Sequence, residues 1–153
     1  MKLLKISIFF LVLNFSALAI GSWLMNNGPI TNWYMNLNQA PWTPPVWVFG
    51  IAWTTIMICF SVYMAYLFME IFNINLILLY LTQLGLNISW NYIFFNQHAI
   101  GLGLFCIIAL TIIVTLFLIN YRKLLQFKSL LIVPYFLWLL IATSLNAYIY
   151  FYN

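Results

Sequence analysis

Amide and tryptophan side chains recur at helical spacing in the second half of the chain. Gln83, Asn87 and Asn91 are four residues apart, and Trp90 lies three residues beyond Asn87. Residues three or four apart share one face of an α-helix. This face can hydrogen-bond to a neighbouring helix or line a pocket for a small molecule, and the sequence leaves both interpretations open.

Two further stripes at the same spacing combine aromatic residues with small or polar ones. They are Phe49, Trp53 and Met57, and Trp138, Ala142 and Asn146. Small-molecule pockets are mostly apolar, with a few polar groups that fix the orientation of the ligand. The stripes have this composition, so they are candidates for the walls of such a pocket.

The sequence contains few residues that could carry out acid–base catalysis or bind a metal ion. No side chain with a full charge occurs from Ile6 to Met69 or from Ile71 to Tyr121. General acid–base catalysis and proton pumping both need ionisable groups at the reacting centre. Glu70 and His98 are expected at solvated helix ends. Cys59 and Cys106 stand singly in apolar runs, so no metal or thiol-redox site and no cofactor is predicted.

The composition of the chain indicates that membrane-spanning helices position these residues. Of 153 residues, 67% are hydrophobic and 4% are charged, whereas a soluble domain carries about a quarter charged residues. A helix needs about 20 apolar residues to cross a bilayer, and five segments qualify. They are residues 3–25, 44–69, 73–95, 99–120 and 130–151. The predicted fold is an all-α membrane protein, one domain over 1–153, built as a five-transmembrane-helix bundle.

The few charges indicate an orientation. All five basic residues and the one acid fall on the side of the predicted bundle that holds the N-terminus. They are Lys2, Lys5, Glu70, Arg122, Lys123 and Lys128. The positive-inside rule then places the N-terminus in the cytoplasm and the C-terminus outside, in what we expect to be a bacterial cytoplasmic membrane. So few basic residues exclude a nucleic-acid footprint.

The first apolar segment has an alternative interpretation as a secretory signal. Lys2 and Lys5 precede an apolar run that contains Ala17-Leu18-Ala19, which resembles a cleavage site. The run continues to Met25, which is longer than a usual signal core. Retention as a membrane helix is therefore the expectation.

The segment between the first two spans, residues 26–43, is the only long connection. It and the residues just after it contain prolines, which stiffen the backbone, and aromatic side chains that can pack onto the bundle. Those residues are Trp33, Tyr34, Pro41, Trp42, Pro44 and Pro45. The segment is predicted to form a lid over an apolar pocket. The alternative is a loop that only seals the outer face.

Several of these motifs, in this order, resemble the TspO/MBR family. This is the family of tryptophan-rich sensory proteins and translocator proteins, also called peripheral-type benzodiazepine receptors. The resemblance covers nearly the whole chain. It rests on Trp33-Tyr34-x-x-Leu37, Pro41, Trp42 and Pro44-Pro45, on Phe49-Gly50-x-x-Trp53, on Gln83-x-x-x-Asn87-x-x-Trp90 with Phe94-Phe95, and on Pro134-Tyr135-x-x-Trp138 with Ala142-Thr143-x-Leu145-Asn146.

The resemblance implies a five-helix bundle, often a homodimer, with a pocket under the first outer loop for porphyrins, sterols or drug-like molecules. Carried over by position, the ligand-binding residues would be Tyr34, Pro44, Phe49, Trp53, Asn87, Trp90, Phe94, Trp138, Ala142 and Asn146. It also implies light-dependent porphyrin breakdown as an activity, with Trp53 and Trp138 as the photochemical residues.

Two departures from the family pattern bear on the ligand. We assign the lysine that relatives carry in the outer loop to Ala40 here, so a cation for a porphyrin propionate is missing. The steroid-recognition pattern near the C-terminus has Leu145 and Tyr148 but no following basic residue, and this pattern is weak even when complete.

The sequence thus predicts a membrane receptor or transporter for a flat hydrophobic ligand, with a porphyrin (tetrapyrrole) as the leading candidate and the lipid bilayer as its surroundings. Asn87 and Asn146 would orient the ligand. The alternatives are an enzyme that degrades porphyrin oxidatively in light, and a membrane scaffold without a ligand, in which the amides only join helices.

Overall fold

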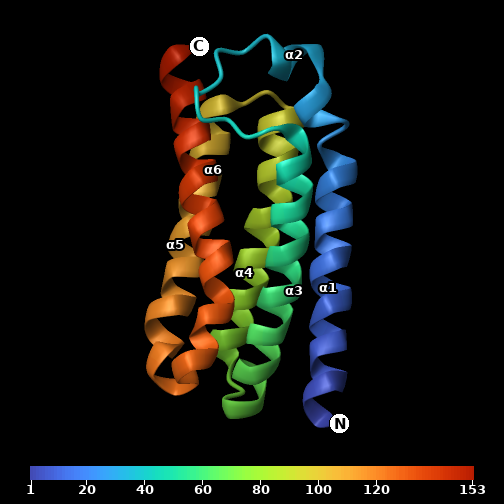
Figure 1. The fold of residues 1–153 in the computed structure, drawn as a ribbon, viewed down its shortest axis with the longest axis vertical. Coiled ribbons are helices and arrows are strands. Elements are labelled where there is room, and N and C mark those ends of the chain that lie inside the picture. The colour runs from blue at the N-terminus through green and yellow to red at the C-terminus, as the bar shows by residue number, and fades with distance from the viewer.

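Five long helices make up most of the chain in the computed structural model, which describes residues 1–153 (Figure 1). They are α1 (Lys2–Leu24), α3 (Val46–Glu70), α4 (Ile74–Asn91), α5 (Ile100–Leu125) and α6 (Val133–Tyr152). The short elements are η1 (Gly28–Ile30), α2 (Asn32–Met35), the π-helical turn η2 (Tyr92–Asn96) and the 3₁₀ segment η3 (Gln126–Ile132). No β-strand is present. The predicted all-α fold with five long helices is confirmed.

The bounds of the helices differ from the predicted ones at the start of α3, at the end of α5 and in the outer loop. The second helix begins at Val46 rather than Pro44, because a residue before proline is held in an extended conformation. The segment after α5 was predicted to be a loop. Instead α5 continues to Leu125, and η3 carries the chain helically into α6. Part of the predicted outer loop is also helical, as η1 and α2.

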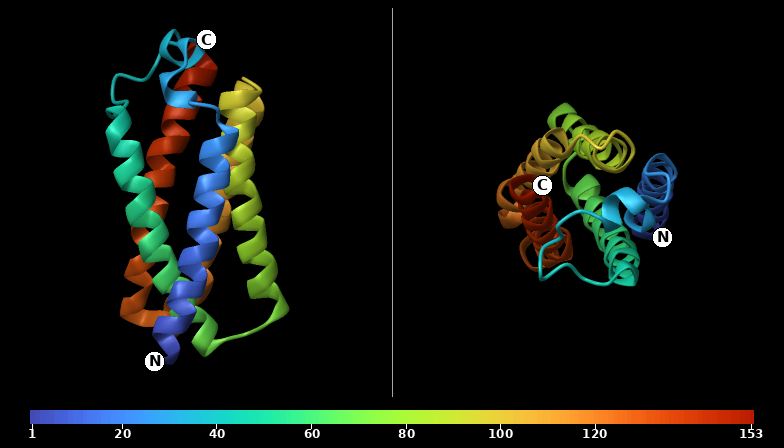
Figure 2. Two further views of the ribbon diagram at one scale, coloured as in Figure 1. Left: turned by 90° about the vertical axis from the view of Figure 1, so that its right-hand side faces the viewer. Right: turned by 90° about the horizontal axis from the view of Figure 1, so that it is seen from above.

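The helices run nearly parallel to the long axis of one bundle (Figures 1 and 2). α1 packs against α3 and α4, and α5 packs against α4 and α6. The N-terminus, the α3–α4 connection and the α5–α6 turn lie at one end, and the C-terminus and α2 lie at the other (Figure 1). An aromatic cluster fills the centre, where the Phe60 ring lies 5.3 Å from that of Tyr135 and 5.7 Å from that of Phe117.

A buried polar network ties α1 into the bundle. Asn14 is 0% exposed and its Nδ2 donates to Ser61 Oγ at 2.8 Å, while Tyr80 OH donates to Asn14 Oδ1 at 2.8 Å. Ser61 in turn donates to the carbonyl of Met57 at 2.6 Å. Asn14 is therefore satisfied by partners on α3 and α4, which join α1 to the rest of the bundle.

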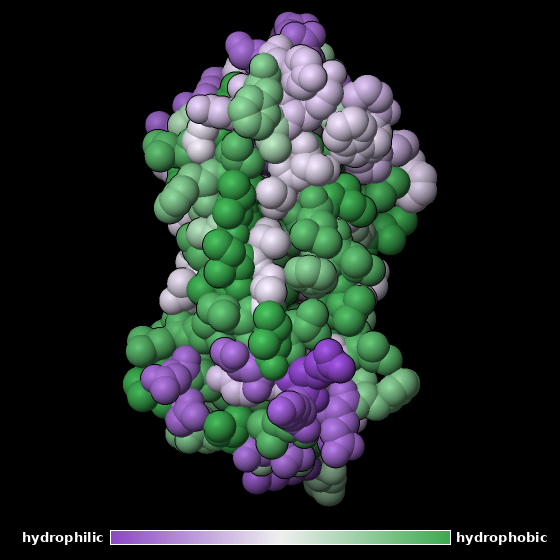
Figure 3. Space-filling view, turned by 90° about the vertical axis from the view of Figure 1, so that its left-hand side faces the viewer, coloured by the Kyte–Doolittle hydropathy of each residue, from purple (hydrophilic) through white to green (hydrophobic).

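Three helical stretches are long and apolar enough to cross a membrane. They are Lys2–Ile30, Val46–Glu70 and Ile100–Tyr152, the last of which combines α5, η3 and α6. α4 is not among them, since its 18 residues include Asn75, Gln83, Asn87 and Asn91. The side of the bundle seen in Figure 3 is largely hydrophobic in its middle, and hydrophilic residues lie at both ends, the most strongly hydrophilic at the lower end.

Candidate ligand-binding site

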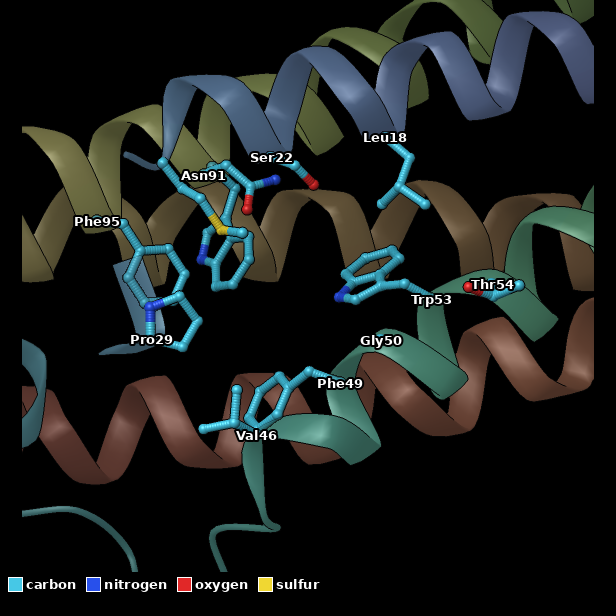
Figure 4. A pocket seen from close by; sticks show the side chains of 12 residues that line it. Leu18, Ser22, Pro29, Val46, Phe49, Gly50, Trp53, Thr54, Asn91 and Phe95 are labelled. Carbon is cyan, nitrogen blue, oxygen red and sulfur yellow. The ribbon is translucent and has the colours of Figure 1, made fainter. Parts of the chain in front are cut away.

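A cavity of about 320 Å³ lies between α1, α3 and the end of α4. Side chains from four parts of the chain surround it (Figure 4). The lining is Leu18, Ser22 and Met25 from α1, Pro29 from η1, Val46, Phe49, Gly50, Trp53 and Thr54 from α3, and Trp90, Asn91 and Phe95 from α4 and η2. This volume is near the lower limit for small-molecule sites, which is about 300 Å³.

Aromatic rings form two walls of this cavity. Phe49 and Trp53, one turn apart, project from α3 (Figure 4). Across from them, Trp90 and Phe95 pack edge to face with ring centroids 5.5 Å apart. Gly28 in η1 allows this arrangement, because a Cβ there would overlap the Phe95 ring. Flat apolar faces therefore line two sides of the hollow.

The polar groups in the cavity are neutral. Asn91 Nδ2 donates to the carbonyl of Asn87 at 3.0 Å, which leaves Oδ1 free to accept. The hydroxyls of Ser22 and Thr54 form no hydrogen bond with the protein, whereas those of Thr82, Thr111 and Thr115 bond back to the preceding turn of their helices. The cavity thus offers unpaired hydrogen-bonding groups to a ligand.

A second group of predicted residues meets directly under the outer loop. Tyr34, Phe94, Ala142 and Asn146 converge there with Phe49, Trp90 and other side chains, but they enclose only about 10 Å³. Phe94 stacks on Trp90 with a centroid distance of 5.8 Å. The site predicted from the sequence is therefore divided, with an open cavity beside α1 and a closed cluster toward α6.

Trp138 lies on the far side of that cluster. Its ring contacts Phe49 edge to face at 5.4 Å. It also lines a shallow groove of about 250 Å³ between α3 and α6. Its indole Nε1 is buried without a hydrogen-bond partner. Trp53 and Trp138, paired in the sequence-based prediction, thus face different hollows.

Two other predicted residues line none of these hollows. Asn87 is buried at 4% exposure and its carbonyl accepts the bond from Asn91. Pro44 lies in the connection that leads into α3, before the extended Pro45. Asn87 thus contacts the lining residue Asn91 through its backbone carbonyl, and Pro44 is not part of the lining.

Several amides of the predicted stripes join helices. Gln83 Nε2 donates to Tyr135 OH at 2.7 Å. Trp90 Nε1 donates to Asn146 Oδ1 at 3.3 Å, and Asn146 Nδ2 donates to the carbonyl of Ala142 at 2.9 Å. Of the two interpretations left open by the sequence, the helix-joining one describes Gln83 and Asn146, and the pocket-lining one describes Asn91.

The outer loop is fixed over this end of the bundle at several points. Trp33 stacks on His98 with ring centroids 4.0 Å apart. Tyr34 is buried against Phe95 at 5.3 Å, and this burial raises the pKa of its phenol. Asn38 and Asn153 exchange hydrogen bonds, with the Asn38 amide donating to Asn153 Oδ1 at 2.8 Å. The loop is therefore an ordered cover.

The assignment of the family's loop lysine to Ala40 is wrong by one residue. Aligned from Trp33 to Pro45 without a gap, the family pattern W-Y-x-x-L-x-K-P-x-W-x-P-P puts its lysine at Gln39 and its first proline at Ala40. Ala40 is 4% exposed, so it offers no room for a solvated ammonium group. Gln39 Nε2 donates to the carbonyl of Tyr34 at 2.9 Å. The loop still lacks the cation, but at position 39.

Sequence reasoning missed the contribution of α1 to the cavity. Leu18, Ser22 and Met25 line it, yet α1 is apolar nearly all round and shows no stripe that would distinguish an inward face. The signal that could have found this face is Asn14 with Gly21, each of which stands four residues before a lining residue, Leu18 or Met25. A Cβ at Gly21 would come within 2.8 Å of Asn91 Nδ2, so the glycine marks a close approach to α4.

Comparison with known proteins identifies the group to which this bundle belongs. The sequence model of the TspO/MBR family matches residues 9–152. The chain belongs to the TspO/MBR family. With this membership and its apolar helical stretches, it is an integral membrane protein.

Three relatives in the TspO/MBR family illustrate the range of similarity. The tryptophan-rich protein TspO of Archaeoglobus fulgidus is 34% identical over 129 residues, which cover 81% of this chain and 82% of the relative. The tryptophan-rich sensory protein of Cereibacter sphaeroides is 30% identical over 114 residues, covering 74% and 72%. The human translocator protein is 27% identical over 125 residues, covering 78% and 74%.

Proposed function

We propose that this TspO/MBR protein is a membrane receptor or transporter that holds a flat, largely apolar ligand in the cavity between α1, α3 and α4, with a porphyrin as the first candidate. The observation that carries the proposal is that Phe49, Trp53 and Trp90 line one hollow together with unpaired polar groups. Aromatic rings supply stacking and apolar burial, and Ser22, Thr54 and Asn91 would orient the ligand. Tyr34, Phe94 and Ala142 would join the site if the closed cluster under the loop opens.

The membrane setting of the proposal has three further parts. We take all five long helices as spans, including α4, whose Gln83 and Asn87 are buried in the bundle. The N-terminus lies in the cytoplasm, following the positive-inside rule. A homodimer is the expected assembly, by resemblance to the family. The names of relatives, a sensory protein and a translocator, agree with a receptor or transporter role.

A titration in the dark tests the ligand site. Purified protein is titrated with protoporphyrin IX while tryptophan fluorescence and the pigment's absorption band are followed. Gly50→Phe places a ring at the cavity, since the Cβ position at Gly50 has no atom within 4 Å. Gly85→Phe is the matched control, because Gly85 has the same free space and lines none of the three hollows. Saturable binding that Gly50→Phe abolishes and Gly85→Phe retains supports the proposal; equal binding by both variants contradicts it.

Light-dependent porphyrin breakdown is the second candidate, and the position of Trp53 in the cavity favours it. An indole beside a bound pigment can exchange electrons with the excited ring. Illumination of the complex, with dark samples as controls, should then bleach the pigment in the wild type and less in Trp53→Phe. Identical bleaching in both proteins would leave binding as the function.

A further inference from the structure

The cavity lies at the uncharged end of the molecule. It is lined by the end of α1, the start of α3 and the end of α4, which share one end of the bundle with the C-terminus (Figures 1 and 4). The six charged side chains occur at the start of α1, the end of α3, the end of α5 and in η3, all at the opposite end. His98 stacks on Trp33 outside the lining. No side chain with a full charge therefore faces a ligand in the cavity.

The mouth of the cavity lies between two helices rather than at the end of the bundle. The exposed members of its lining are Ser22 on α1 and Val46, Gly50 and Thr54 on α3. At the end of the bundle, Pro29 and Phe95 close the hollow (Figure 4). In a protein embedded in a bilayer, a mouth on the flank of the bundle opens toward lipid. A ligand using it would leave water before it meets the protein.

From these two features we infer that the site selects uncharged ligands, such as esters and amides, over carboxylates of the same shape. This inference rests on the proposed binding function and names the class of ligand. A carboxylate taken from water into apolar surroundings is strongly unfavourable unless a cation or several donors pair with it. Ser22, Thr54 and Asn91 are neutral partners suited to carbonyl, ester and amide groups.

The residue that would decide this preference is Ser22. It stands at the mouth and at the end of α1, so a lysine there would place an ammonium group beside the ligand while reaching toward the interface. Ser89 provides a matched position, because it is an exposed serine near the end of α4 that lines none of the three hollows. Ser22→Lys and Ser89→Lys add the same charge at the same end of the bundle, but only the former adds it to the cavity.

The test compares protoporphyrin IX, which has two carboxylates, with its dimethyl ester, which has the same ring and none. Dissociation constants are measured in the dark for the wild type and both lysine variants, and the signal from Gly50→Phe is subtracted to remove partitioning into detergent. The expected wild-type result is tighter binding of the ester by about tenfold or more. Ser22→Lys should reduce this ratio, and Ser89→Lys should retain it.

The outcomes separate the inference from the proposed function. Equal or tighter binding of the diacid by the wild type, or an unchanged ratio in Ser22→Lys, would overturn the selection of uncharged ligands while leaving the binding site in place. Saturable binding of neither porphyrin would overturn the proposed function, and the inference with it.

Discussion

Individual polar residues in this bundle are best understood by following where their hydrogen bonds go. In an apolar environment an unpaired polar group is costly, so a residue such as Asn14 is retained only with partners. Asn14 has two, on different helices. The hydroxyls of Ser22 and Thr54 line the cavity without a partner in the protein, so they are available to a ligand.

Replacing Asn14 by alanine should destabilise the protein. The change removes two interhelical hydrogen bonds and leaves Tyr80 OH without its acceptor, at a cost of about 1–3 kcal/mol in the free energy of unfolding. Unfolding of the purified protein in detergent, followed by circular dichroism, measures the loss. Ser16→Ala, at an exposed position of the same helix, should change little. Equal stability of the two variants would show that the network contributes nothing.

Gly28 is the residue that sets the position of Phe95. In Gly28→Ala the new methyl group would overlap the Phe95 ring, so η1 or the ring must shift at a cost of about 1–3 kcal/mol. Because Phe95 lines the cavity, porphyrin affinity should fall together with stability. Gly85→Ala, which has free space, is the control in both the unfolding and the titration experiments. An unaltered porphyrin affinity in Gly28→Ala would show that the position of Phe95 does not affect ligand binding.

At this scale the sequence predicts which residues turn inward but not what they contact. The spacing of Gln83, Asn87 and Trp90 correctly indicates one buried face. Whether an inward amide meets a helix or a hollow depends on the size and tilt of the opposite helix. Gln83 donates a hydrogen bond to Tyr135, whereas Asn91 lines the cavity. Both residues belong to the same stripe with four-residue spacing, so the spacing alone does not distinguish them.

At the scale of elements, the outer loop and the end of α6 form one unit. Asn38 bonds to Asn153 through its backbone amide and carbonyl and to the Tyr152 carbonyl through its side chain at 2.9 Å. Trp42 Nε1 adds a bond to Ser144 Oγ at 3.1 Å. The cover over the site is therefore fixed to the same helix that carries Trp138 and Asn146.

Loosening this attachment should make the loop more mobile. Asn153→Ala removes both bonds to the Asn38 backbone, which are exposed and worth about 0.5–1.5 kcal/mol each. Hydrogen exchange, read by mass spectrometry, should become about threefold to tenfold faster for the peptide containing Asn38. Asn36→Ala, an exposed asparagine of the same loop, is the control. No difference between the variants would mean that the aromatic contacts alone hold the loop.

Helix existence follows from the sequence, while several helix ends do not. Apolar length predicts all five long helices, and Pro44-Pro45 marks the approach to α3. The π-helical turn at Tyr92–Asn96 and the 3₁₀ segment at Gln126–Ile132 carry no local signal. The π-helical turn η2 packs closely on α5, because a Cβ at Gly103 would lie 2.9 Å from the Phe94 ring.

For the molecule as a whole, the separation of charge along the bundle is the basis of the proposed orientation. The charged end includes an exposed ion pair between Lys128 and Glu70 at 4.0 Å, and Lys128 also lies over the Tyr66 ring at 4.5 Å. The opposite end carries the loop and no formal side-chain charge. A cytoplasmic charged end is the arrangement that the positive-inside rule favours.

Labelling of single cysteines tests this orientation. In a background with Cys59→Ala and Cys106→Ala, Asn36→Cys should react with a membrane-impermeant maleimide on intact cells. Lys123→Cys, exposed at the charged end, should react only after permeabilisation. Labelling of both cysteines from outside would contradict the proposed number of spans. The reverse pattern would show that the protein has the opposite orientation in the membrane.

The central claim is that the ligand occupies the cavity beside α1 rather than the groove at Trp138, and porphyrin affinity in two tryptophan variants tests it most directly. Affinities are read from the pigment's absorption band in the dark. Trp53→Phe should weaken binding about threefold to tenfold, because part of the stacking surface in the cavity is lost. Trp138→Phe should stay within about twofold of the wild type. Weaker binding in Trp138→Phe alone would contradict the account and place the ligand between α3 and α6.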